Sequence, residues 1–143
     1  MSSWRPIPSE LRTHQNLALL TYLDREQPHT HSDLVEELYA ALSDAAVSYF
    51  CPAPEDYAFT IAYRPNGIIV GAAVGMRDVL VRVKAEMIHA AVADGALLAE
   101  DIGDHWTRFP VFSSTSPLET KRERLAKWLQ ATCRATPLLT ATR

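Results

Sequence analysis

The sequence predicts one α+β domain, a meander-based antiparallel sheet with helices packed on one face, in the order α-α-β-β-β-β-α-β-β-α. Three observations predict this class. Residues 57–63, YAFTIAY, alternate large and small side chains with the period of a strand. A Pro65-Asn66-Gly67 turn joins them to the apolar run 68–75. The segments on either side repeat apolar residues every three or four positions, as helices do.

Two helices are expected first. Residues 9–26 carry an apolar stripe that Ser9 caps and Pro28 ends. Residues 30–45 carry a second stripe, with Thr30 or Ser32 as the cap and acidic residues in the first turn, where the helix dipole favours them.

The expected strands then follow at residues 47–50, 57–63, 68–75 and 79–83. In the last of them the valines are expected to point inward and Arg82 outward. Gly67 is expected to serve the turn. The face that carries Gly71, Ala73 and Gly75 is small, which indicates either a ligand pocket or the close approach of a helix.

A short helix at residues 84–94, two strands within 96–102 and 105–112, and a closing amphipathic helix complete the order. Ser116, Pro117 and Glu119 predict a capping box at the start of that last helix.

The 143 residues fit a single α+β domain, 1–143, with 1–30 as an N-terminal helical extension, 31–136 as the core and 137–143 as a tail. No run approaches the roughly 18 apolar residues of a membrane span, so we expect no membrane partner and a cytoplasmic location. Cys51 and Cys133 are too few for a disulfide framework and are expected to be plain thiols.

No catalytic, phosphate-binding or metal-binding motif stands out, so we assign no catalytic residue, no cofactor and no metal. Segment 100–108 gathers acidic, histidine, aromatic and arginine side chains, which are the groups that a polar ligand site or acid–base chemistry needs. The candidate ligand-binding residues are Tyr63, His105, Trp106 and Arg108. The alternative is a solvated acidic hairpin around Gly103-Asp104.

A basic stretch in the last helix is the candidate nucleic-acid contact: Lys121, Arg122 and Arg124 lie beside Trp128. The alternative is a solvated helix face. Residues 1–63 carry three arginines and nine acidic residues, whereas 64–143 carry eleven basic and eight acidic residues, and the net charge is -3. Because this basic excess is small, nucleic acid is the less favoured partner.

The meander ending in GMRDVLVRV, the helix AEMIHAAVADGA, the strand HWTRFPVF and the closing helix resemble the small bacterial domains of the TfoX N-terminal, MmcQ/YjbR-like and YdhG-like group over about residues 32–135. That resemblance implies a single domain that acts in regulation or binds nucleic acid, and it carries over no catalytic motif. The order of elements is also similar to the secretion-chaperone-like fold, which implies a dimer that holds protein partners.

Three functions follow from these observations. The favoured one is a non-catalytic binding or regulatory module in a bacterial cytoplasm, because the patterns explain packing and none assembles an acid, a base and a nucleophile. The alternative is a dimeric chaperone-like or adaptor protein with a protein partner or self-association. The third is a small enzyme with a site near His105 and Arg108.

Overall fold

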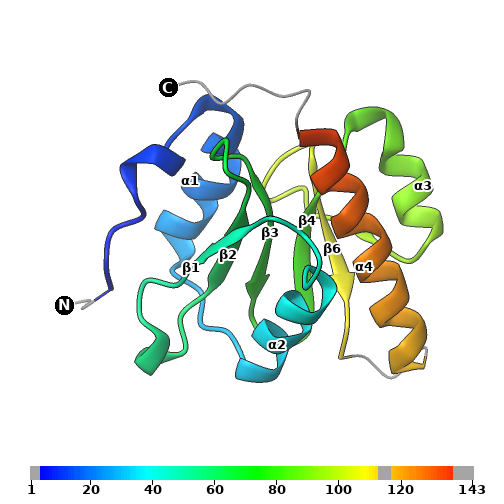
Figure 1. Ribbon diagram of the computed structural model, residues 1–143, viewed down its shortest axis with the longest axis horizontal. Coiled ribbons are helices and arrows are strands. Elements are labelled where there is room, and N and C mark those ends of the chain that lie inside the picture. The colour runs from blue at the N-terminus through cyan, green and yellow to red at the C-terminus, as the bar shows by residue number, and fades with distance from the viewer. Residues whose placement is uncertain (1–3, 113–116, 137–143) are drawn as a thin grey trace.

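The computed structural model of the protein describes residues 4–112 and 117–136. Its centre is a six-stranded antiparallel open sheet with the strand order β1-β2-β3-β4-β6-β5 (Figure 1). The strands are β1 Ser48–Phe50, β2 Thr60–Tyr63, β3 Ile69–Val74, β4 Asp78–Arg82, β5 Leu97–Leu98 and β6 Trp106–Pro110. The α-helices are α1 Leu17–Glu26, α2 Ser32–Ala41, α3 Ile88–Ala93 and α4 Leu118–Ala135. The predicted α+β class and the order of elements are confirmed.

The meander of β2, β3 and β4 forms as the turn residues predict. Gly67 has a φ of 87° and donates its N–H to the Arg64 carbonyl at 2.8 Å, so it is the turn glycine. The pairing of β2 with β3 shifts register between Ala62 and Tyr63. This bulge leaves Val70 without an opposite residue and turns its side chain toward α2 and α4, whereas Ile69 faces α1.

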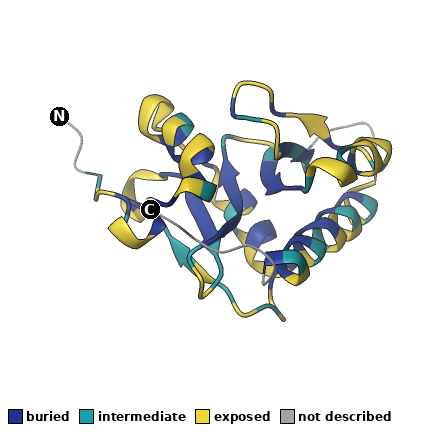
Figure 2. Ribbon diagram, turned by 90° about the horizontal axis from the view of Figure 1, so that it is seen from above, coloured by how far each residue is buried: buried dark blue, intermediate teal, exposed yellow. Residues whose placement is uncertain are grey.

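Helices cover both faces of the sheet, which corrects the expectation of helices on one face. Helices α2 and α4 pack on one face around Leu38 and Leu129, while α1 and the segment before it cover the other face (Figure 1). The cause lies in β2 and the residue before it, because Phe59 and Ile61 give the sheet a second apolar face that must also leave water. The central strands β2, β3 and β4 are accordingly almost wholly buried, whereas β5 at the edge is exposed. Many of the other exposed positions lie on the outer sides of the helices (Figure 2).

The N-terminal segment differs from the single helix predicted for residues 9–26. Two 3-10 turns, Ser9–Leu11 and His14–Asn16, precede α1, and no side-chain cap is formed at the first. Helix α1 ends at Glu26, where Gln27 adopts a left-handed φ of 42°. The predicted extension therefore packs along the sheet through its leucines.

The cap of α2 is also different from the predicted Thr30 or Ser32. His31 is the N-cap, and its Nδ1 accepts a hydrogen bond from the Asp33 backbone N–H at 3.1 Å. The Thr30 hydroxyl instead donates to the Ala73 carbonyl at 3.0 Å and so ties the chain before α2 to β3.

The small-residue face of the meander accepts a helix. A Cβ placed on Gly71 would lie 2.7 Å from Leu129 Cδ2 and 2.9 Å from the Leu80 carbonyl oxygen, so α4 approaches β3 at this point as closely as a glycine allows. Ala73 is fully buried in the same cluster. Gly75 has a φ of 79° and serves the turn between β3 and β4.

Ser116 of the predicted capping box and the predicted tail 137–143 lie outside the described residues; α4 begins at Leu118, directly after Pro117. The strand predicted within 96–102 is limited to the two residues of β5. Within residues 4–112 and 117–136, no helix combines the length and the apolar composition needed to cross a bilayer.

Candidate ligand pocket

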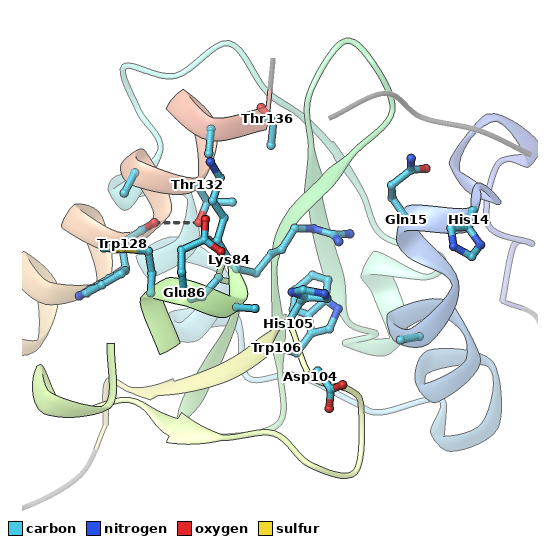
Figure 3. Close-up of a pocket in the computed structure, with 17 residues that line it drawn as sticks. His14, Gln15, Lys84, Glu86, Asp104, His105, Trp106, Trp128, Thr132 and Thr136 are labelled. Carbon is cyan, nitrogen blue, oxygen red and sulfur yellow. Dashed lines mark hydrogen bonds between the residues drawn. The ribbon is translucent and has the colours of Figure 1, made fainter. Parts of the chain in front are cut away.

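A pocket of about 690 Å³ lies at the end of the sheet where β4 stops and β6 starts. It reaches across both helical layers. Figure 3 shows Trp128, Thr132 and Thr136 on one side, His14 and Gln15 on the other, and Lys84, Glu86, Asp104, His105 and Trp106 between them. The pocket is thus built from four segments that are far apart in the sequence.

Arg82, the last residue of β4, lines this pocket although its side chain is buried, with 8% of the residue exposed. The expectation that it points outward into solvent is wrong, because α1 and the turn before it cover that face of the sheet. Its Nε donates to the Ile69 carbonyl at 2.7 Å. Its guanidinium carbon lies 4.8 Å from the centre of the Trp106 ring, a cation–π contact on the same face.

Asn16 holds the guanidinium from the N-terminal segment. Its Oδ1 accepts from Arg82 Nη2 at 2.9 Å and from the Ile69 N–H at 3.0 Å. Its Nδ2 donates to the carbonyls of Leu11 and Gly67, both at 2.8 Å. Asn16 is completely buried and uses both ends of its amide, but it is neutral and leaves the charge of Arg82 uncompensated.

Arg82 takes part in none of the ion pairs formed by the described residues. Desolvation lowers the pKa of Arg82 to about 10, so the guanidinium still carries its charge at neutral pH. Nη1 has no hydrogen-bond partner in the described part of the chain. Among the described residues, Thr13 Oγ1 is the one fully enclosed side-chain nitrogen or oxygen that lacks a hydrogen-bond partner. Because Nη1 also lacks a partner, it must be accessible to solvent. Arg82 thus lines the pocket and keeps one guanidinium nitrogen that is neither hydrogen-bonded nor fully enclosed.

The opposite wall is the buried side of α4. Trp128 lies against Asp94, to which its Nε1 donates at 2.9 Å. The Thr132 hydroxyl lies within hydrogen-bond distance of the Arg82 and Trp128 carbonyls, which joins α4 to the end of β4. Both side chains are fixed by these contacts, so this wall is preformed.

Two of the four predicted ligand-binding residues line the pocket. Trp106 lies at the base of the pocket, and its ring contacts Arg82. His105 lies beside Trp106, and the His105 carbonyl accepts a hydrogen bond from the Val83 N–H at 2.7 Å. Arg108 faces α1 outside the pocket, and both its Nη atoms donate to Asp101 at 2.8 Å. Tyr63 packs at the margin of the α1-side cluster, away from the lining residues.

The three basic residues predicted to meet nucleic acid do not share one exposed face. Lys121 is buried, with 6% exposed. Arg122 is exposed, but its Nε and Nη2 donate to the two carboxylate oxygens of buried Glu37. Arg124 lies against Gly95. Nucleic-acid contact stays a prediction. The three side chains that it names already contact other residues of the protein.

His29, His31 and Cys133 have structural surroundings. His29 Nδ1 lies 2.9 Å from the Asp56 carbonyl and its ring contacts Trp4, whereas His31 caps α2. In the described ranges, no three His, Cys, Asp or Glu side chains are arranged to hold a metal ion. Cys133 is buried, and burial raises the pKa of its thiol.

Sequence reasoning missed Arg82, Asn16 and His14. One signal was present for Arg82, since a lone arginine interrupts an otherwise apolar strand, VLVRV. No local signal pointed to Asn16, because its partners come from the distant turn at Gly67 and from β3 and β4.

Comparison with protein-family models, with curated proteins and with solved structures finds no match to this chain. The structure itself defines an α+β domain with a preformed pocket around a buried arginine.

Proposed function

We propose that this protein is a non-catalytic binding module whose pocket holds a small organic anion. The observation that carries the proposal is Arg82, a buried cation that lines the pocket and has no carboxylate partner in the described ranges. Buried charges in proteins are normally paired, because an unpaired one has lost its hydration without compensation. An anion from solution would supply the missing partner.

The surroundings of Arg82 strengthen that attraction. The contacts with Trp106, Asn16 and Ile69 fix the guanidinium in place before a ligand arrives. Low solvent access also makes the interaction between opposite charges stronger than it would be on the surface. An anion would therefore meet a preorganised donor and pay little entropy of reorganisation.

Binding is favoured over catalysis by the geometry of the ionisable residues. The side-chain hydrogen bonds of histidines in the described part of the chain are those of His29 and His31, which lie outside the pocket. His14 and His105 are therefore not hydrogen-bonded to Glu86 or Asp104 there, and no acid–base pair is assembled. We also propose a cytoplasmic location, on the ground that Cys51 and Cys133 are both free thiols.

The test is a thermal-shift and calorimetric screen with phosphate, sulfate, acetate, citrate and benzoate. At least one anion should raise the melting temperature, because a ligand that binds only the folded state stabilises it. Arg82→Lys keeps the charge but loses the fixed fork and should weaken that binding at least tenfold. The matched control is Arg108→Lys, in the neighbouring strand and outside the pocket. If every anion leaves the melting temperature unchanged, or if both variants bind like the wild type, the proposal fails.

A second candidate is an adaptor that binds a protein partner or a second copy of itself. The observation that favours it is β5 at the edge of the sheet, where Leu97 and Leu98 are 55% and 50% exposed. An edge strand with exposed leucines is able to pair with another strand. Light scattering on a size-exclusion column should then give a dimer that Leu97→Lys returns to a monomer; a wild-type monomer at high concentration would exclude self-association.

A further inference from the structure

We infer that the ligand is a carboxylate whose body is apolar and contains a ring. This inference rests on the proposed function, because it names the chemical class of the anion that the same pocket takes. It follows from the part of the guanidinium that is left free, from the other charges of the pocket, and from its walls.

The Arg82 guanidinium has two edges, and only one of them is occupied. The edge formed by Nε and Nη2 is occupied by the Ile69 carbonyl and Asn16 Oδ1. The end edge, formed by Nη1 and the second N–H of Nη2, remains. Its two N–H bonds run parallel, and their spacing matches the two oxygens of a carboxylate.

The charged side chains around the pocket limit the net charge of the ligand. Apart from Arg82, Lys84 is the one lysine or arginine among the described lining residues, and Glu86 and Asp104 lie on the same rim. A phosphate monoester carries close to two negative charges and three oxygens that need donors. Lys84 offsets one of the two carboxylates, so the rim keeps an excess of one carboxylate, which opposes a dianion more than a monoanion. A monoanion is matched by Arg82 alone.

The third step concerns the body of the ligand. The indole rings of Trp106 and Trp128 and the methyl groups of Ala131 and Ala135 form apolar walls around the charged centre. Aromatic rings pack against indoles in stacked or edge-to-face contacts and gain more than their buried area alone provides. A volume of about 690 Å³ is also far larger than an inorganic ion needs and lies within the usual range for organic ligands.

The experiment is calorimetry with four matched probes: 3-phenylpropanoate, its neutral amide, 2-phenylethylphosphonate and acetate. We expect 3-phenylpropanoate to bind at least tenfold more tightly than each of the other three. The amide lacks the charge, the phosphonate carries a second charge when the titration is run above its second pKa, and acetate lacks the apolar body.

A variant that leaves Arg82 intact tests the position of the body. Ala131→Leu places a larger side chain in the α4 wall and should weaken 3-phenylpropanoate at least tenfold while changing acetate less than threefold. Gln130→Leu, on the exposed side of the same helix, should leave both unchanged.

The failure of this inference is distinct from that of the proposed function. Arg82-dependent binding in which the phosphonate equals or exceeds the carboxylate, or acetate equals 3-phenylpropanoate, would overturn the ligand class and keep the anion-binding module. The absence of Arg82-dependent binding for every probe and every anion of the screen would overturn both. Equal weakening of 3-phenylpropanoate and acetate by Ala131→Leu would overturn the assigned place of the ring.

Discussion

Arg82 Nη2 donates a hydrogen bond to Asn16 Oδ1 at 2.9 Å and joins residues that stand 66 positions apart in the chain. This contact couples the N-terminal segment to the centre of the sheet. The Asn16 amide makes three further hydrogen bonds, with Leu11, Gly67 and Ile69. One buried amide therefore ties the segment before α1 to the sheet, in addition to the packing of its leucines.

Asn16→Ala should lower the free energy of unfolding by about 3 kcal/mol, because it leaves several buried polar groups without partners. Urea denaturation measures this change. Gln130→Ala, on the exposed side of α4, is the control and should cost less than about 0.5 kcal/mol. Equal losses of unfolding free energy in the two variants would show that the buried amide stabilises the protein no more than an exposed one.

Thr13→Val should stabilise the protein by about 1 kcal/mol. The Thr13 hydroxyl oxygen is enclosed and, in the described part of the structure, has no hydrogen-bond partner. Valine keeps the shape of the side chain and removes the polar atom whose desolvation is uncompensated. The measurement is the urea midpoint at constant slope; a lower midpoint would mean that the hydroxyl does make a bond.

Gly71→Ala should destabilise the protein by about 2 kcal/mol, since the new methyl group would meet Leu129 and the Leu80 carbonyl at distances below 3 Å. In a Leu129→Ala background the same substitution should cost less, because the contact with the helix side chain is gone, although the contact with the Leu80 carbonyl remains. A double-mutant cycle with urea denaturation measures this coupling. Strict additivity of the two changes would contradict the close approach of α4.

Asp94 should contribute to the loss of stability in acid. Its Oδ2 accepts from Lys127 Nζ at 2.6 Å and from Trp128 Nε1 at 2.9 Å, and these hydrogen bonds lower the pKa of Asp94 below its ordinary value. The unfolded chain therefore takes up this proton at a higher pH than the folded chain. The stabilisation is complete above the ordinary carboxylate pKa and is lost as pH falls through the folded pKa.

Urea midpoints between pH 7 and pH 3 test this expectation. Asp94→Asn should flatten the fall in stability below about pH 4, the ordinary range of a carboxylate. Asp44→Asn, at an exposed position after α2, should leave the profile parallel to that of the wild type. Parallel profiles for both variants would contradict the role of Asp94.

The sequence allowed the fold class to be predicted because the signals for it are local. The alternation in YAFTIAY and the turn at Gly67 each depend on a few adjacent residues, and the structure contains the meander that they indicate. The second helical layer was missed because a strand buried on both faces has no polar face to reveal it. Phe59 and Ile61 read as one inner face, although Ala62 on the other side is equally buried.

The candidate pocket was less predictable, for a related reason. His105 and Trp106 stood out by residue type, but the group that gives the pocket its charge, Arg82, read as a solvated position. Its burial depends on Asn16 and α1, which the sequence presented as an extension of the core. Only the packing of the two layers brings these residues together.

One wall of the pocket comes from residues 14–18 and another from residues 128–136, with the sheet between them. The pocket therefore exists only in a chain whose last helix has docked on the sheet. A partly folded chain that lacks this contact would have the arginine but only part of the enclosure around it.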